Sequence, residues 1–75
     1  MSDYAVKVAD SIRDHCKQDS RLRGVSYLAS LEGHRNQCVE NLRDSRGTTE
    51  EDYWSIRLRL VESAIADAEH QEVVT

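Results

Sequence analysis

The pattern of apolar and polar positions predicts a helix over about residues 49–70. Thr48 or Thr49 can cap this helix, and a carboxylate three residues later, Glu51 or Asp52, can satisfy a further backbone N–H group of the first turn. Apolar side chains then recur every three or four residues, the spacing that places them along one side of an α-helix. They are Tyr53, Ile56, Leu60, Val61, Ala64, Ile65 and Ala68.

The same spacing predicts two earlier helices, over about residues 3–17 and 21–44. Continuing the register of the first helix by heptads reaches mostly polar residues, so we expect a break between Lys17 and Gly24, where residues 18–20 offer turn chemistry. A single continuous helix through residue 44 is the alternative. The apolar positions are Ala5, Val8, Ile12 and His15 or Cys16 in the first helix, and Val25, Leu28, Leu31, Cys38, Val39 and Leu42 in the second.

Two polar segments complete the predicted architecture. Residues 44–47 end with Gly47, which suits the left-handed position after a helix, and so short a loop makes the last two helices an antiparallel hairpin. Residues 31–37 are mostly polar and contain Gly33. Either this is a solvent-facing turn whose glycine lets another helix approach closely, or a polar patch is held there for a ligand or partner. We therefore predict an all-α fold, a single domain over residues 1–75 with three helices.

Length and charge narrow the function. A chain of 75 residues can bury only a marginal core, and domains of this size usually add a disulfide, a metal or a partner chain, so we expect a homodimer. The net charge of −4 argues against nucleic-acid binding, and Arg57 and Arg59 point about 200° apart on a helix, not along one basic face. No stretch approaches the ~20 apolar residues of a membrane span, and no signal peptide is evident, so we expect a cytoplasmic protein with reduced thiols.

Cysteine and histidine residues give the only candidate metal ligands. His34 and Cys38 are four residues apart on one helix face, and Cys16 could add a third ligand. The simpler interpretation is that both cysteines are small core residues, which we favour. The three glycines are too far apart to form a phosphate-binding loop, and no motif presents a nucleophile, so we expect neither an enzyme nor a cofactor.

The clearest functional signal is surplus apolar surface on the last helix. Trp54 and Leu58 lie off its main stripe and form a second strip that continues towards Val61. Aromatic residues and arginine are enriched in interface hot spots, so this strip indicates self-association or a partner protein, unless the whole wide stripe packs within a three-helix bundle. The candidate interface, with Arg57 and the acidic end as its rim, consists of Tyr53, Trp54, Arg57, Leu58, Val61, Glu62, Asp67 and Glu69.

Residues from about Arg35 onward resemble small helical-hairpin proteins of tailed bacteriophages. The matching features are an arginine in the first helix of the hairpin, a Gly47 turn, the acidic start at residues 50–53 and the alanine-rich residues 64–68. The resemblance implies a phage or mobile-element accessory protein that acts in the host cell. We expect this chain to bind and inhibit a host protein through a basic surface on that host protein, and to do so without being an enzyme. The alternatives are a virion structural or assembly component and a small helical nucleotide or nucleic-acid binder.

Overall fold

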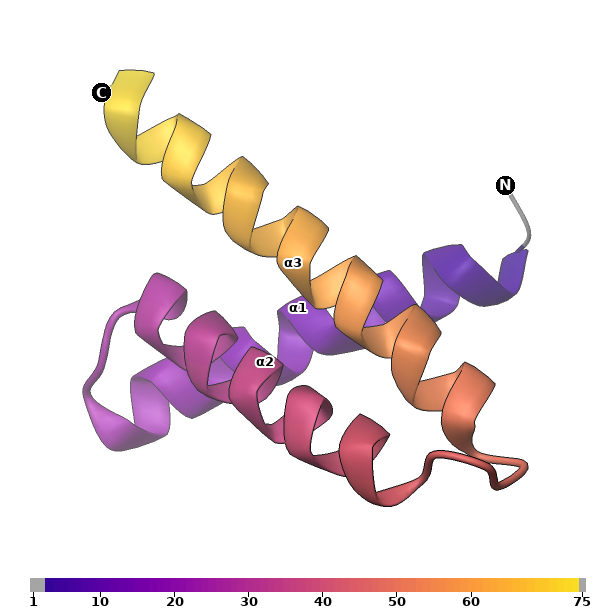
Figure 1. Cartoon of the computed structure of the whole chain (residues 1–75). Coiled ribbons are helices and arrows are strands. Elements are labelled where there is room, and N and C mark those ends of the chain that lie inside the picture. Colours follow the sequence, from indigo (N-terminus) through magenta and orange to yellow (C-terminus); the bar gives the residue numbers. More distant parts are fainter. Residues whose placement is uncertain (1–2, 75) are drawn as a thin grey trace.

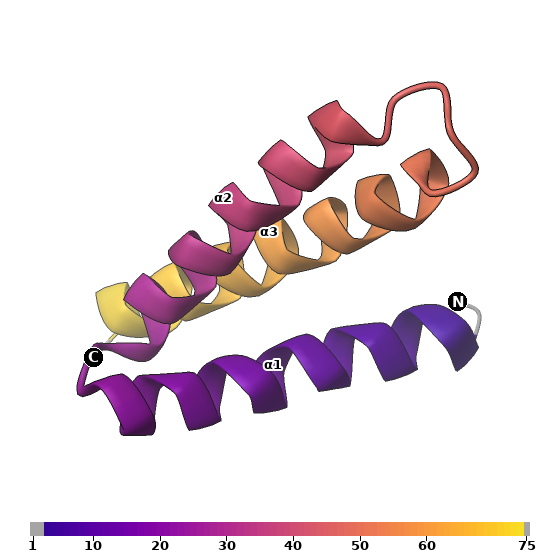
Figure 2. The ribbon, with the colours of Figure 1, turned by 90° about the horizontal axis from the view of Figure 1, so that it is seen from below.

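The computed structural model describes the backbone of residues 3–74 and the side chains of residues 3–71. It contains three α-helices, α1 (Asp3–Arg23), α2 (Tyr27–Asp44) and α3 (Glu51–Val74). α2 and α3 form an antiparallel hairpin and share the most extensive contact, while α1 crosses behind them (Figure 1). Seen from below, α1 forms a second layer against one face of this hairpin (Figure 2). The predicted all-α fold and its hairpin are confirmed.

The first break in the chain lies later than the sequence pattern predicts. Residues 18–20 remain helical, and α1 continues to Arg23. Gly24 then takes a φ of +67°, a conformation that glycine adopts without a side-chain clash. The N–H of Val25 donates to the carbonyl oxygen of Ser20 at 3.1 Å, which closes the end of the helix. The decisive signal is therefore the glycine, not the polar residues before it.

The second helix correspondingly starts after its predicted first residue. Ser26 is extended, with φ −68° and ψ 156°, and its Oγ accepts a hydrogen bond from the N–H of Ala29 at 3.0 Å. This is the N-cap geometry that serine favours, because its hydroxyl satisfies an orphan N–H group of the first turn. The helices α1 and α2 are thus separate, and residues 24–26 alone join them.

The turn between α2 and α3 follows the predicted chemistry. Gly47 has a φ of +81°, as expected for a left-handed residue after a helix. Thr48 Oγ1 accepts a hydrogen bond from the N–H of Glu50 at 3.2 Å, and the carboxylate of Glu51 accepts one from the N–H of Gly47 at 2.9 Å. A threonine and a carboxylate thus satisfy backbone N–H groups together. α3 continues to Val74, beyond the predicted end at residue 70.

All three helices contribute to one core. Both cysteines are free thiols and fully buried, which confirms them as core residues. Val25 and Val39, which the pattern assigns to the core, are instead exposed: Val25 lies in the α1–α2 connection, and Val39 is turned by about 100° from Cys38. The buried apolar residues are Ile12, Cys16, Leu31, Cys38, Val61, Ala64 and Ile65. No helix within the described residues is long and apolar enough to cross a membrane.

Candidate functional site

The apolar face of α3 differs from the predicted one. Trp54 and Leu58 are partly buried and pack against the core, whereas Tyr53 and Ile56 are each 40% exposed. Positions 54, 58, 61, 65 and 68 follow each other at steps of four and three, so they form a continuous row along the helix. The core lies along that row. The apolar spacing assigns Tyr53 and Ile56 to the core stripe and leaves Trp54 and Leu58 as a spare strip. This assignment is wrong, because Trp54 and Leu58 pack against the core and Tyr53 and Ile56 are exposed.

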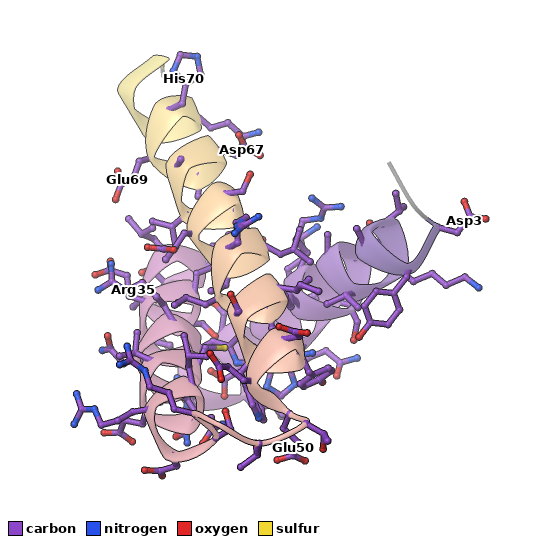
Figure 3. The ribbon with its side chains drawn as sticks, turned by 45° about the vertical axis from the view of Figure 1, so that its right-hand side comes forward. Asp3, Arg35, Glu50, Asp67, Glu69 and His70 are labelled. Atoms are coloured by element: carbon purple, nitrogen blue, oxygen red, sulfur yellow. The ribbon has the colours of Figure 1, made fainter. Side chains whose placement is uncertain are left out.

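The eight candidate interface residues consequently do not share one surface. Val61 is fully buried, so it can contribute to a binding face only through its neighbours. Asp67 and Glu69 are both exposed, but they point to opposite sides of α3 (Figure 3). Glu62 is also exposed. The acidic end of α3 is therefore spread around the helix.

Trp54 lies in the first turn of α3, at the closed end of the hairpin. Its ring meets that of Tyr53 edge to face, with centroids 5.0 Å apart. It also lines a hollow of about 420 Å³ against the α2–α3 turn, opposite Asn41 and Thr48. One side of the indole thus packs on the core while another remains reachable from solvent.

A second hollow, of about 280 Å³, separates the N-terminal half of α1 from the middle of α3. Its walls are mainly apolar. Val6 in this wall is 46% exposed, and Ile56 lies one helical turn before Leu60 on the same side of α3. We call this surface the α1–α3 groove; it is lined by Ala5, Val6, Ala9, Arg13, Leu60, Ser63, Ala64 and Asp67.

The polar middle of α2 is explained by its neighbours on the other helices. Among the described residues, no atom of another helix lies within 4 Å of the position that a Cβ on Gly33 would occupy. Gly33 is exposed to solvent, as one interpretation expects, but it is not a site of close helix approach. His34 is half-buried, and its Nε2 accepts a hydrogen bond from Nε of Arg57 at 3.2 Å. The ring of His15 lies 5.8 Å from that of His34. One side chain from each helix thus contributes to a group of three, His15, His34 and Arg57, which we call the Arg57 cluster.

Burial and charge affect the titratable groups of this cluster. Burial lowers the pKa of His34, and the positive charge of Arg57 and the neighbouring His15 lower it further. Burial raises the pKa of the Cys38 thiol, and the nearby Arg57 partly offsets this effect. Cys16 also has a raised pKa because of its burial. Both thiols are thus held in the neutral form.

The candidate metal ligands do not gather. Cys16 and Cys38 are buried in the core, while the His34 ring faces Arg57. Among the side chains that the structure describes, no group of three or more His, Cys, Asp or Glu residues is arranged to hold a metal ion.

Comparison of the chain with models of known protein families, with curated proteins and with solved structures gives no match.

Proposed function

We propose that this chain is a non-enzymatic protein-interaction protein and that it binds its partner through the α1–α3 groove. The observation that carries the proposal is the exposure of apolar side chains at this groove: Val6 lies in its α1 wall, and Ile56 lies next to its α3 wall, one helical turn before Leu60. Exposed apolar surface beside a groove is typical of protein–protein contact sites. This groove takes the place of the Trp54 and Leu58 strip, because those two side chains pack against the core.

The partner element that fits best is an amphipathic helix. Two neighbouring helices present ridges with a groove between them, and an apolar row spaced by three and four residues can lie in such a groove. Arg13 and Asp67 provide charges of both signs in the same lining, so the edge of the site can contact either sign on the partner. Because a core of this small size is only marginally stable, burial of further apolar surface by a partner would stabilise the fold.

The narrower part of the proposal is that the partner is a host protein and that binding inhibits it. Its support is the sequence resemblance to phage accessory proteins from about Arg35 onward. That resemblance covers α3, which supplies one wall of the groove, but not α1, which supplies the other.

The test compares two valines of similar exposure. Val6→Glu places a carboxylate in the groove, whereas Val39→Glu places one on the exposed side of α2. Both variants should keep the helical circular-dichroism spectrum of the wild type. We expect partner proteins recovered from host lysate by the wild type to be retained by Val39→Glu and lost with Val6→Glu. Equal recovery by all three proteins would place binding elsewhere.

Light scattering on the same three proteins separates a second copy of this chain from a different partner. If the groove binds a second copy, the wild type and Val39→Glu are dimers and Val6→Glu is a monomer. If it binds another protein, all three are monomers, and only the recovery of the partner differs between them.

A further inference from the structure

Arg57 is a half-buried cation whose described hydrogen bonds go only to neutral groups. Its Nε donates to Nε2 of His34 and its Nη1 donates to the hydroxyl of Tyr53, each at 3.2 Å. Its guanidinium carbon also lies 6.0 Å from the centroid of the Tyr53 ring. These contacts fix the orientation of the guanidinium group, and among the described residues none of them neutralises its charge.

Carboxylates neutralise two other arginines of this protein. Arg13 pairs with Asp10, and Arg23 pairs with Asp19. Among the side chains of residues 3–71, no carboxylate forms an ion pair with Arg57, although the whole chain carries a net charge of −4. Withdrawing a charge from water without a counter-ion is unfavourable, so an unpaired and partly buried guanidinium is a natural site for an external anion.

The two histidines of this grouping add no negative charge, and the carboxylate of Asp19, one helical turn after His15 on α1, interacts with His15. His15 is exposed, and its ring lies 5.8 Å from His34. Arg57 also forms a hydrogen bond with the buried side chain of Cys38, which is a further neutral partner. Arg57, His34 and His15 come from α3, α2 and α1, which means that the folded arrangement of all three helices creates this grouping.

We propose that Arg57, His34 and His15 form a binding site for a phosphate group at the junction of the three helices. A guanidinium group matches phosphate oxygens with paired N–H donors, and two imidazoles can supply further donors when protonated. Phosphate carries more charge and more acceptor oxygens than a carboxylate. It therefore suits a grouping of three basic side chains better than a single carboxylate would.

Anion binding at this site is coupled to protonation. The groups that face His34 are His15 on α1, Cys38 on its own helix, and Arg57 on α3. The hydroxyl of Tyr53 is hydrogen-bonded to Arg57. In the free protein, burial and the neighbouring basic groups lower the pKa of His34 and so favour its neutral form. A bound anion opposes the effect of those basic groups and favours a proton on the imidazole. Binding of an anion of fixed charge should thus be tighter at pH 5.5 than at pH 8.

The experiment follows the Nε–H signal of Arg57 and the imidazole C–H signals by NMR during titration with inorganic phosphate. Ionic strength is kept constant with chloride. We expect saturable shifts in the wild type, at least ten-fold weaker binding for Arg57→Gln, as expected for the loss of a charge-assisted contact, and weaker binding for His15→Gln. Arg23→Gln, which removes an arginine that is already paired with Asp19, should leave the affinity for phosphate unchanged. Acetate should bind at least ten-fold more weakly than phosphate.

Sulfate, whose charge is constant over this pH range, tests the coupling and should bind more tightly at pH 5.5. Because His15 is exposed, His15→Gln keeps the test valid if Arg57→Gln does not fold. Shifts that increase linearly without saturation, or an affinity that is the same in the wild type and in His15→Gln, would overturn the proposal. Equal affinity for acetate would overturn the assignment to phosphate.

Discussion

Arg23 and Arg57 belong to two side-chain networks that differ in charge balance. The Arg23 network joins α1 to α2: Arg23 donates to both carboxylate oxygens of Asp19, at 2.9 and 2.6 Å, and Ser30 Oγ donates to the same carboxylate at 2.7 Å. The Arg57 cluster joins α2 to α3 through His34, which is neutral. The first network connects two helices and the second draws one side chain from each of the three, but only the first contains its own counter-ion.

The two networks differ in whether every charge has a partner of opposite charge within the protein. In the first network, Arg23 and then Ser30 lower the pKa of Asp19, so the negative form that both donors need is stabilised. In the second, burial and then Arg57 lower the pKa of His34, and the neutral imidazole is the form that accepts the hydrogen bond from Arg57. The Arg23 network satisfies all its charges internally. The Arg57 cluster keeps one positive charge that the described residues do not balance.

The largest expected effect comes from the core residue between the two networks. Leu31 follows Ser30 directly and lies one turn before His34, and its side chain is 0% exposed. Leu31→Ala should lower the free energy of unfolding by about 2–5 kcal/mol and weaken both networks, because the cavity loosens the packing beneath them. Leu22→Ala, at an 87% exposed position, is the control and should change stability by less than about 0.5 kcal/mol. Urea denaturation followed by circular dichroism measures both, and equal losses would contradict the core assignment.

A glycine lies beside each network, and the two glycines differ in whether the backbone conformation requires glycine. Gly24 follows Arg23 with a φ of +67°, and Gly33 precedes His34 within a helix with free space around it. Gly24→Ala should destabilise the protein by about 1 kcal/mol or more, whereas Gly33→Ala should stabilise it by up to about 1 kcal/mol, because alanine costs less entropy in a helix. Thermal melts of the two variants should shift in opposite directions. A loss of stability in Gly33→Ala would mean that the middle of α2 needs a glycine for a reason that the structure does not contain.

Acid should affect the two networks in different pH ranges. Folded His34 has a pKa below its ordinary value of 6.5. Between pH 6.5 and the folded pKa the unfolded chain therefore binds more protons than the folded one, so the free energy of unfolding decreases as the pH is lowered through this range. Folded Asp19 has a pKa below its ordinary value of 3.8, so its contribution is present above that value and is lost as pH falls through the folded pKa.

Two substitutions separate these ranges. His34→Gln should remove the loss of stability just below pH 6.5 and leave the loss below pH 3.8, and Asp19→Asn should do the reverse. Urea midpoints measured between pH 3 and pH 8 test both. An unchanged pH profile in His34→Gln would contradict the account of the Arg57 cluster.

The sequence was sufficient for the helices and the hairpin because local chemistry determines them. Apolar spacing, the left-handed Gly47 and the Thr48 cap each act within a few residues, and the structure contains all three. The break after α1 was misplaced because Asp19 and Ser20 are typical turn residues. Their side chains instead bond to Arg23, to Ser30 and to the carbonyl oxygen of Val25, and only the fold brings some of these partners close.

The faces of α3 and the Arg57 cluster could not be predicted in the same way. Two apolar rows on α3 have helical spacing, and only the placement of α1 and α2 decides that Trp54 packs inward while Ile56 remains exposed. His34 follows His15 by 19 residues in the sequence, and Arg57 follows His34 by 23. The polar segment around His34 gave the only sequence signal, as one of two interpretations of residues 31–37.

The most direct test of the difference between the two networks is the pKa of His34, measured by NMR from its imidazole C–H signals in the wild type and in Arg57→Gln. The account predicts a wild-type pKa below 6.5, since burial and Arg57 both oppose protonation, and a higher pKa in Arg57→Gln, in which the neighbouring charge is lost. Arg23→Gln is the matched control and should leave the pKa of His34 unchanged. A wild-type pKa at or above 6.5, or one that does not rise when Arg57 is replaced, would contradict the claim that this cluster holds an unbalanced positive charge.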